Sequence, residues 1–168
     1  AALARDRGVF LVDDAAQTVG ASFEGVPAGA WGDAGLLSFD KGKAVAAVDG
    51  GALVADSPDL AHAIEKRIAC LPGPGLMTTV GHLTKVLVYA ACLRPSVYWI
   101  PNSVPGLGLG LTRYAPGFAI ERQSPWLAAL AATMWPRLRE FKSARTAAAR
   151  RYVEGLRSVE RLAPVSPV

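Results

Sequence analysis

The chain has 168 residues, of which 51% are hydrophobic, and its formal net charge is +4. This length is enough for a domain with a hydrophobic core, and the composition excludes an intrinsically disordered chain. The excess of basic residues lies near the end of the chain, on the outer side of a predicted amphipathic helix. We therefore expect these charges to form a solvated face and expect no nucleic-acid partner.

The first part of the chain predicts short strands. Ala1 to Arg7 is expected to be the end of a helix, closed by Gly8. Val9 to Val12 is a continuous apolar run, typical of a strand in a parallel sheet that is covered on both faces. The glycine-rich segment 15–33 predicts a loop with one short strand. Residues 35–39 predict the second main strand of an α/β fold.

Helices follow a third predicted strand at 51–55. Ser57 and Pro58 indicate a helix start, with serine as the cap and proline in the first turn, and this helix should end near Cys70. A second helix, 76–93, is apolar nearly all round, which indicates a buried segment or a partner surface. Its longest apolar run is too short to cross a bilayer, although it could lie on a membrane surface.

The end of the chain predicts one long helix. Residues 95–125 are expected to form an irregular connection, and the helix should start near Ser124 and kink at Pro136. Its apolar residues recur at helical spacing and predict one buried stripe. The members of this stripe are Leu127, Leu130, Met134, Leu138, Phe141, Ala148, Tyr152 and Leu156.

Cysteine and histidine residues show no metal-binding pattern. Cys70 and Cys92 lack the paired spacing of a zinc or redox motif, and we expect two buried, reduced thiols. His62 and His82 stand alone on predicted helices, where packing or surface roles are expected. No basic-then-apolar leader opens the chain. These features predict a cytoplasmic protein without a metal site.

Three polar residues that could contact a single ligand follow two of the predicted strands. Asp14 follows the first apolar run, and Ser38 and Lys43 follow the second. These groups can converge only if the two runs are neighbouring strands of one sheet. Each suits pyridoxal phosphate: a lysine amine can form an imine with its aldehyde, a carboxylate can keep its ring nitrogen protonated, and a hydroxyl can hold its phosphate. Gln17 could touch the ring.

Simpler roles exist for each of these residues. Asp13 and Asp14 could cap a helix, form a turn or supply half of a metal site. Lys41 and Lys43 could be solvated loop charges. Short motifs match by chance, so neither feature alone indicates a cofactor site. The residues by themselves do not choose between Lys41 and Lys43.

Four short blocks, in order, resemble the DegT/StrS-type sugar aminotransferases, a family of fold-type-I enzymes that use pyridoxal phosphate. The blocks are Asp13-Asp14-Ala15-Ala16-Gln17, Ser38-Phe39, Lys43 and Asp49-Gly50-Gly51. The resemblance implies that Lys43, chosen over Lys41 by its spacing from Ser38, bonds to the cofactor. It also implies that Asp14 meets the pyridinium nitrogen, that Ser38 binds phosphate, and that Gln17 lies beside the ring. Fainter similarity continues to about Leu156.

The resemblance also implies an architecture and a reaction. Residues 1–123 would be part of the large cofactor-binding domain, and residues 124–168 would be a linking helix and the start of the small domain. The family's members are more than twice as long, so the chain is expected to be an internal fragment. The implied reaction moves an amino group from an amino acid, glutamate, to a keto group of a nucleotide-linked sugar, in polysaccharide biosynthesis, by an enzyme whose site lies at a dimer interface.

Two departures from the family's pattern leave an alternative open. Asp40 stands where many members have histidine, and its charge would oppose imine formation at Lys43. The family's Gly-x-Asn-x-Arg segment has no clear counterpart. The alternative is a non-catalytic remnant, or an interaction module that uses helix 76–93 as a docking surface.

Overall fold

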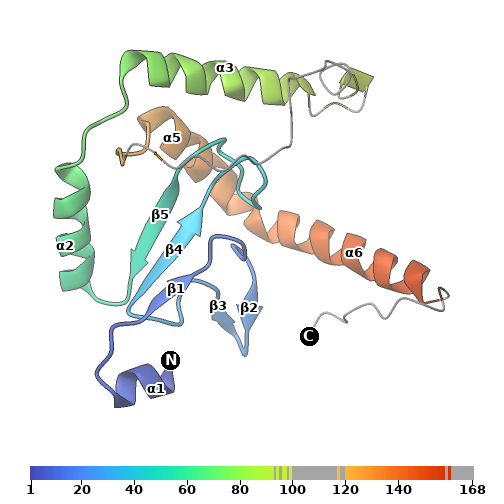
Figure 1. Ribbon diagram of the computed structural model, residues 1–168. Helices are drawn as coiled ribbons and strands as arrows, with labels where there is room; N and C mark the ends of the chain where they lie inside the picture. Colours follow the sequence, from blue (N-terminus) through green and yellow to red (C-terminus); the bar gives the residue numbers. More distant parts are fainter. Residues whose placement is uncertain are drawn as a thin grey trace.

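The computed structural model describes residues 1–92, 94, 96–97, 99, 117, 120–157 and 159 (Figure 1). The predicted connection 95–125 therefore falls mostly outside the described residues. The strands are β1 (Val12–Asp14), β2 (Ser22–Phe23), β3 (Val26–Pro27), β4 (Ala34–Ser38) and β5 (Gly51–Ala55). The helices are α1 (Ala2–Asp6), α2 (Pro58–Ala69), α3 (Leu76–Cys92), α5 (Pro125–Met134), the 3-10 helix η1 (Trp135–Arg137) and α6 (Leu138–Leu156).

A three-stranded sheet, in the order β1-β4-β5, organises the first part of the chain. The strands β1 and β4 are parallel, and Asp14 stands opposite Leu36. This pairing confirms that the two apolar runs are neighbouring strands. The strand β5 pairs with β4 in the antiparallel direction, with Leu53 opposite Leu36. The sheet is therefore mixed, and only its β1-β4 half is parallel.

The two faces of this sheet have different surroundings. Side chains alternate between the faces along a strand, so Leu37 and Phe39 of the β4 segment point to one face and Leu36 to the other. Leu37 and Phe39 are buried in a cluster that includes Ala131 of α5. On the other face, Val12 is 52%, Leu36 38% and Leu53 46% exposed. We call the face that carries these three residues the open face.

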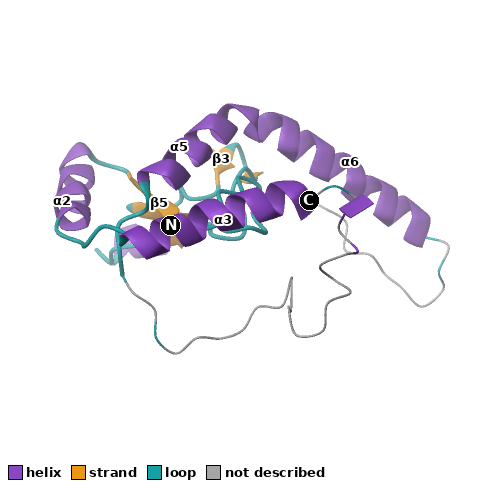
Figure 2. Ribbon diagram, turned by 90° about the horizontal axis from the view of Figure 1, so that it is seen from above, coloured by secondary structure: helices purple, strands orange, loops and turns teal. Residues whose placement is uncertain are grey.

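The prediction of a first strand buried on both faces is wrong for this structure. The strand starts at Val12 instead of Val9, and Val9, Phe10 and Val12 are all exposed. An apolar run indicates that side chains suit burial, but another segment must supply the cover. Among the described residues, α5 covers one face of the sheet, and the side chains of the open face remain exposed (Figures 1 and 2).

The glycine-rich loop contains a small hairpin of two strands, where one short strand was predicted. The strands β2 and β3 pair in the antiparallel direction. Glu24 and Gly25 between them have φ values of 48° and 81°. Positive φ at both central residues is the geometry of the two-residue turns that join such strands, and glycine adopts it without a steric penalty.

The helix starts follow their local signals, but the burial of α3 does not follow its composition. The Ser57 side chain accepts a hydrogen bond from the Leu60 amide at 3.3 Å and so caps α2 as predicted. The helix α3 has no buried residue, so of its two predicted roles the buried segment is wrong and the partner surface stays a prediction. Cys70 is exposed and Cys92 half-buried, which corrects the prediction of two buried thiols. No helix in the described part of the chain is long and apolar enough to span a membrane.

The predicted kink at Pro136 is confirmed. It lies in η1, which separates α5 from α6. Proline lacks an amide hydrogen and clashes with the preceding turn, so a straight helix cannot continue through it. The helix α5 packs on the sheet through Ala131, with Leu130 and Met134 beside it, whereas α6 extends away from the sheet (Figure 1). The predicted stripe is therefore buried only in its first part: Ala148 and Tyr152 are exposed.

Candidate active site

The carboxyl ends of β1 and β4 bring two of the predicted residues to the same edge and face of the sheet. Asp14 is the last residue of β1, and Ser38 is the last residue of β4. Asp14 stands opposite Leu36, so their side chains share a face, and Ser38, two residues beyond Leu36, shares it too. The sheet thus places the acid and the alcohol at one edge and on one face, and their convergence with the Lys43 amine stays a prediction.

Asp14 and its neighbour Asp13 point to opposite faces and have different partners. The Asp14 side chain is exposed, and its Oδ1 accepts a hydrogen bond from the Ala16 amide at 3.0 Å. One Asp13 oxygen, Oδ2, accepts from the amides of Gly29, at 2.6 Å, and Trp31, at 3.2 Å. Asp13 therefore holds the glycine-rich loop, and Asp14 is left at the open face.

Lys43 lies in a loop whose base is closed by two backbone hydrogen bonds. The Phe39 amide donates to the Gly50 carbonyl at 2.9 Å, and the Ala47 amide donates to the Phe39 carbonyl at 2.7 Å. Val45 and Ala47 are completely buried, which anchors the loop in the core. Lys43 is half-buried and Lys41 is exposed. Burial thus distinguishes the two lysines, with Lys43 the better shielded.

Asp40, the residue that departs from the family's pattern and would oppose imine formation, accepts hydrogen bonds from backbone amides of its own loop. Its Oδ1 accepts a hydrogen bond from the Lys41 amide at 2.7 Å, and its carbonyl accepts from the Lys43 amide at 3.0 Å. Among the described residues, Asp40 forms no ion pair with the Lys43 amine. The Asp40 carboxylate is exposed to water, which reduces its effect on a neighbouring amine.

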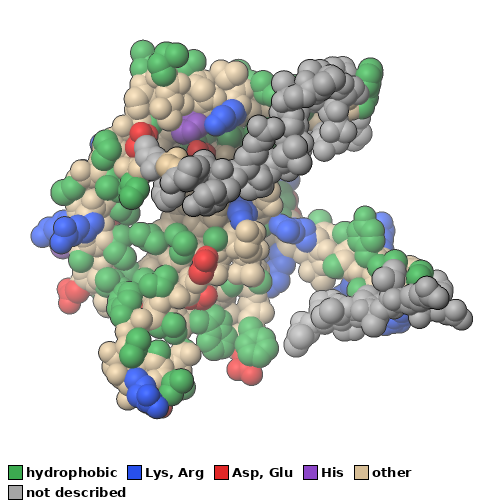
Figure 3. Space-filling view, in the orientation of Figure 1, with side chains coloured by type: hydrophobic (Ala, Val, Ile, Leu, Met, Phe, Trp, Pro, Cys, Tyr) green, Lys and Arg blue, Asp and Glu red, His purple; other side chains and the backbone are tan. Residues whose placement is uncertain are grey.

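Gln17 and the leucines of the open face complete the surroundings of Asp14. Gln17 is exposed in the turn that follows β1, where the Thr18 amide donates to the Ala15 carbonyl at 3.0 Å. Leu36 and Leu53 are exposed on the face of the sheet that Asp14 and Ser38 share. Figure 3 shows hydrophobic side chains gathered over this part of the molecule. A carboxylate, a hydroxyl and an apolar surface, with an amine on the loop that follows β4, match the chemical needs of a flat, charged, phosphorylated ring.

The side chains of His82 and Gln123, neither of which was a predicted site residue, hold the turn after the Lys43 loop. His82 was expected to stand alone on its helix, but its Nε2 lies 3.3 Å from Asp49 Oδ2. The Gln123 side chain donates from Nε2 to the Asp49 carbonyl at 3.4 Å. The sequence held no signal for these contacts, because the three residues lie on segments far apart in the chain.

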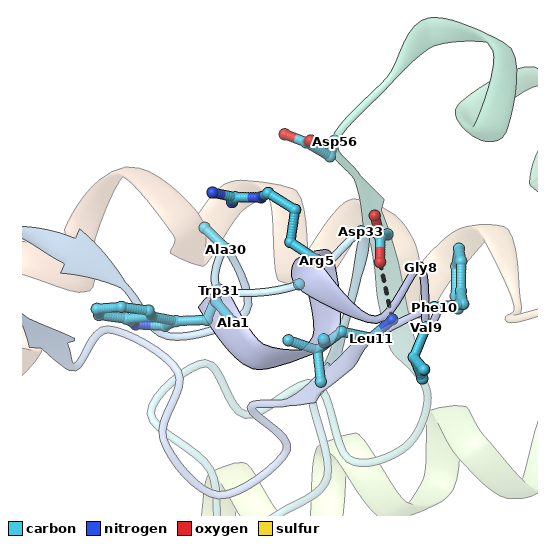
Figure 4. A pocket seen from close by; sticks show the side chains of 12 residues that line it. Ala1, Arg5, Gly8, Val9, Phe10, Leu11, Ala30, Trp31, Asp33 and Asp56 are labelled. Atoms are coloured by element: carbon cyan, nitrogen blue, oxygen red, sulfur yellow. Dashed lines mark hydrogen bonds between the residues drawn. The ribbon is translucent and has the colours of Figure 1, made fainter.

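A separate hollow of about 440 Å³ lies at the other end of β1 (Figure 4). Arg5, Trp31, Asp33 and Asp56 are among its lining residues, and the Leu11 amide donates to Asp33 Oδ2 at 2.7 Å. None of the predicted site residues lines it. Within the described ranges, no three His, Cys, Asp or Glu side chains gather in a way that could hold a metal ion.

Comparison with known families decides where the chain belongs. The DegT/DnrJ/EryC1/StrS aminotransferase family matches residues 1–167. The chain is a member of this family. The family resemblance inferred from the four sequence blocks is confirmed, and so is the α/β fold of the large domain of pyridoxal-phosphate-dependent transferases. The DegT-family aminotransferases in the structural comparison share this arrangement over almost the whole chain.

Individual relatives of this DegT-family chain are aminotransferases with longer sequences. The L-glutamine:2-deoxy-scyllo-inosose aminotransferase of Streptomyces fradiae is 39% identical over 85 residues, which are 46% of this chain and 20% of that protein. The aminotransferase TlmJ from Streptoalloteichus hindustanus is 28% identical with a TM-score of 0.60, over 100% of this chain and 37% of that one. The chain therefore spans between about a fifth and two fifths of these relatives.

Proposed function

We propose that the protein is an aminotransferase that uses pyridoxal phosphate and moves an amino group from an amino acid to a keto group of a nucleotide-linked sugar. The observation that carries the proposal is the shared edge and face of Asp14 and Ser38, next to the closed loop that bears Lys43. Membership of an aminotransferase family supports the reaction class. We propose a cytoplasmic homodimer, with residues 1–123 in the large domain and 124–168 leading into the small one.

The proposed roles follow from the chemistry of the side chains. When bound, the cofactor supplies an aldehyde and an electron-withdrawing ring. Asp14 would hold a proton on the ring nitrogen, because a carboxylate beside a protonated nitrogen stabilises its charge. The Ser38 hydroxyl would donate to a phosphate oxygen. Lys43 would hold the cofactor and then carry a proton to and from the substrate carbon as general acid and base. Gln17 would limit how the ring tilts.

The nature of the substrates is proposed from the relatives. One, from Saccharopolyspora spinosa, is a dTDP-4-dehydro-2,3,6-trideoxy-D-glucose 4-aminotransferase, 40% identical over 58 residues, which are 34% of this chain and 15% of that protein. Its name supports a nucleotide-linked keto sugar as acceptor. The relative from Streptomyces fradiae is named for L-glutamine. Glutamate and glutamine are therefore the two amino donors to compare. Each is mixed with a dTDP-linked keto sugar or with 2-deoxy-scyllo-inosose, and mass spectrometry detects the aminated product.

The role of Lys43 is tested by finding which lysine the cofactor modifies. The purified protein is mixed with equimolar pyridoxal phosphate, reduced with borohydride, which fixes the cofactor to its lysine, and digested for peptide mass mapping. We expect the label on Lys43, its loss in Lys43→Ala and its retention in Lys41→Ala. A label on Lys41 would move the role to that residue. A label spread over many exposed lysines would contradict a cofactor site and favour the non-catalytic alternative.

A further inference from the structure

The turn that closes the Lys43 loop is held from two other segments of the chain. The Asp49 carboxylate lies 3.3 Å from Nε2 of His82, which is on α3. The Asp49 backbone carbonyl accepts a hydrogen bond at 3.4 Å from the side-chain amide of Gln123, which lies just before α5. The helix α3 lies beyond the carboxyl end of β4, and α5 lies behind the sheet (Figures 1 and 2). The turn is therefore fixed from two directions.

The backbone of this turn is strained, which makes such contacts necessary. Val48 has a φ of 73°, in the left-handed region that a β-branched residue rarely adopts. Strain of this kind persists only where surrounding contacts enforce it. Gly50 has a φ of 89°, and a Cβ there would lie 2.6 Å from the Gln123 amide group. The Gln123 side chain is thus packed directly against the turn.

The strained turn is also the base of the Lys43 loop. The Gly50 carbonyl, next to Asp49, accepts the hydrogen bond from the Phe39 amide that closes this loop. A change in the turn therefore changes the base from which Lys43 extends. We propose that His82 and Gln123 are positioning residues, which hold Asp49 and so fix the loop that presents Lys43 to the cofactor. This inference rests on the cofactor-binding role proposed above for Lys43.

The surroundings of His82 show which of its ring nitrogens contacts Asp49. The His82 side chain is only 15% exposed, and its Nδ1 is buried without a hydrogen-bond partner among the described residues. Because Nε2 faces the Asp49 carboxylate, Nε2 carries the hydrogen that is donated. A glutamine at position 82 can place an amide N–H at a similar reach, whereas an alanine cannot. The pair His82→Ala and His82→Gln thus separates loss of the contact from loss of the imidazole ring.

The test measures hydrogen exchange of the amides of residues 39–50 in the purified protein, without cofactor. We expect about tenfold faster exchange in His82→Ala, the effect of losing one hydrogen bond to a charged group. Exchange should return near the original rate in His82→Gln. The matched control is His62→Ala, because His62 is exposed on α2 and should leave the loop unchanged. If His82→Ala does not fold, Gln123→Ala removes the other contact to Asp49 and should also speed exchange in the loop.

The same variants are then labelled with pyridoxal phosphate and borohydride. We expect less label on Lys43 in His82→Ala, by about tenfold if the loop opens as proposed, and recovery in His82→Gln. Loop exchange that is unchanged in both His82→Ala and Gln123→Ala would overturn the positioning role, whatever the labelling shows. Faster loop exchange combined with an unlabelled original protein would support the contact with Asp49 and overturn the proposed aminotransferase function.

Discussion

At the residue scale, two adjacent carboxylates end the same strand and have different surroundings. Alternation along β1 sends Asp13 to one face, where it accepts hydrogen bonds from Gly29 and Trp31, and Asp14 to the open face beside Ser38. An amino-acid pattern shows two acids in a row, but the sheet pairing gives each its neighbours. The structural contacts of Asp13 and the exposure of Asp14 lead to opposite expectations for their variants.

We predict that Asp13→Ala lowers stability and that Asp14→Ala lowers activity. Removing the Asp13 carboxylate leaves two backbone amides without their acceptor, which should cost about 2 kcal/mol of the free energy of unfolding. Asp14→Ala should leave that free energy nearly unchanged and reduce the proposed amino transfer about 100-fold, because the ring nitrogen loses its counter-charge. Urea unfolding and product formation measure the two effects. If both variants lost the same activity and the same stability, the assignment of a structural role to Asp13 and a role in activity to Asp14 would be contradicted.

At the element scale, α3 and α5 are both rich in apolar residues, but only α5 is part of the core. Leu127 of α5 is 2% exposed, whereas Leu76 of α3 is 78% exposed. The composition of α3 predicted either a buried segment or a surface for a partner, and among the described residues it is not buried. The helix α5 packs on the sheet because its Ala131, with Leu130 and Met134, meets the face that carries Leu37, whereas His82 of α3 contacts the turn at Asp49.

We predict a large stability difference between two leucine variants. Leu127→Ala should lower the free energy of unfolding by about 2–5 kcal/mol, because it removes buried methyl groups and leaves a cavity. Leu76→Ala, the matched control, should change it by less than about 0.5 kcal/mol. Urea or thermal unfolding followed by circular dichroism measures both. A similar cost at the two positions would mean that α3 is buried in solution.

At the scale of the whole molecule, the open face leaves a contiguous apolar surface next to the proposed site. Val12, Leu36 and Leu53 come from three neighbouring strands and share this face. Apolar patches of this kind mark places where other protein surfaces or ligands bind. We therefore expect the open face to bind other protein surfaces.

We predict that the 168-residue chain associates with itself as its concentration rises, and that Leu53→Lys weakens this association about tenfold by placing a charge in the open face. Ile68→Lys is the matched control, because Ile68 is an exposed apolar residue on α2, away from that face. Sedimentation velocity over a range of concentrations measures both. Association that is equally weakened by Ile68→Lys would show that the open face is not the surface involved.

Local sequence signals were enough to predict several of the elements and the family. The start of α2 at Ser57, the kink at Pro136 and the strands β4 and β5 were predictable because serine capping, the missing amide of proline and apolar runs act over a few residues. The four sequence blocks identified the family, which the comparison confirms. The roles of Asp14, Gln17, Ser38 and Lys43 stay predictions, although the sheet places Asp14 and Ser38 together as expected.

Only the tertiary structure decided which apolar surfaces are covered and which distant polar groups meet. The exposure of α3 and of the open face depends on where other segments pack, which no run of neighbouring residues encodes. The contacts of His82 and Gln123 with Asp49 depend on the placement of α3 and of the segment before α5 against one turn. Local signals fix backbone geometry over a few residues, whereas contacts between distant residues arise only when whole elements pack together.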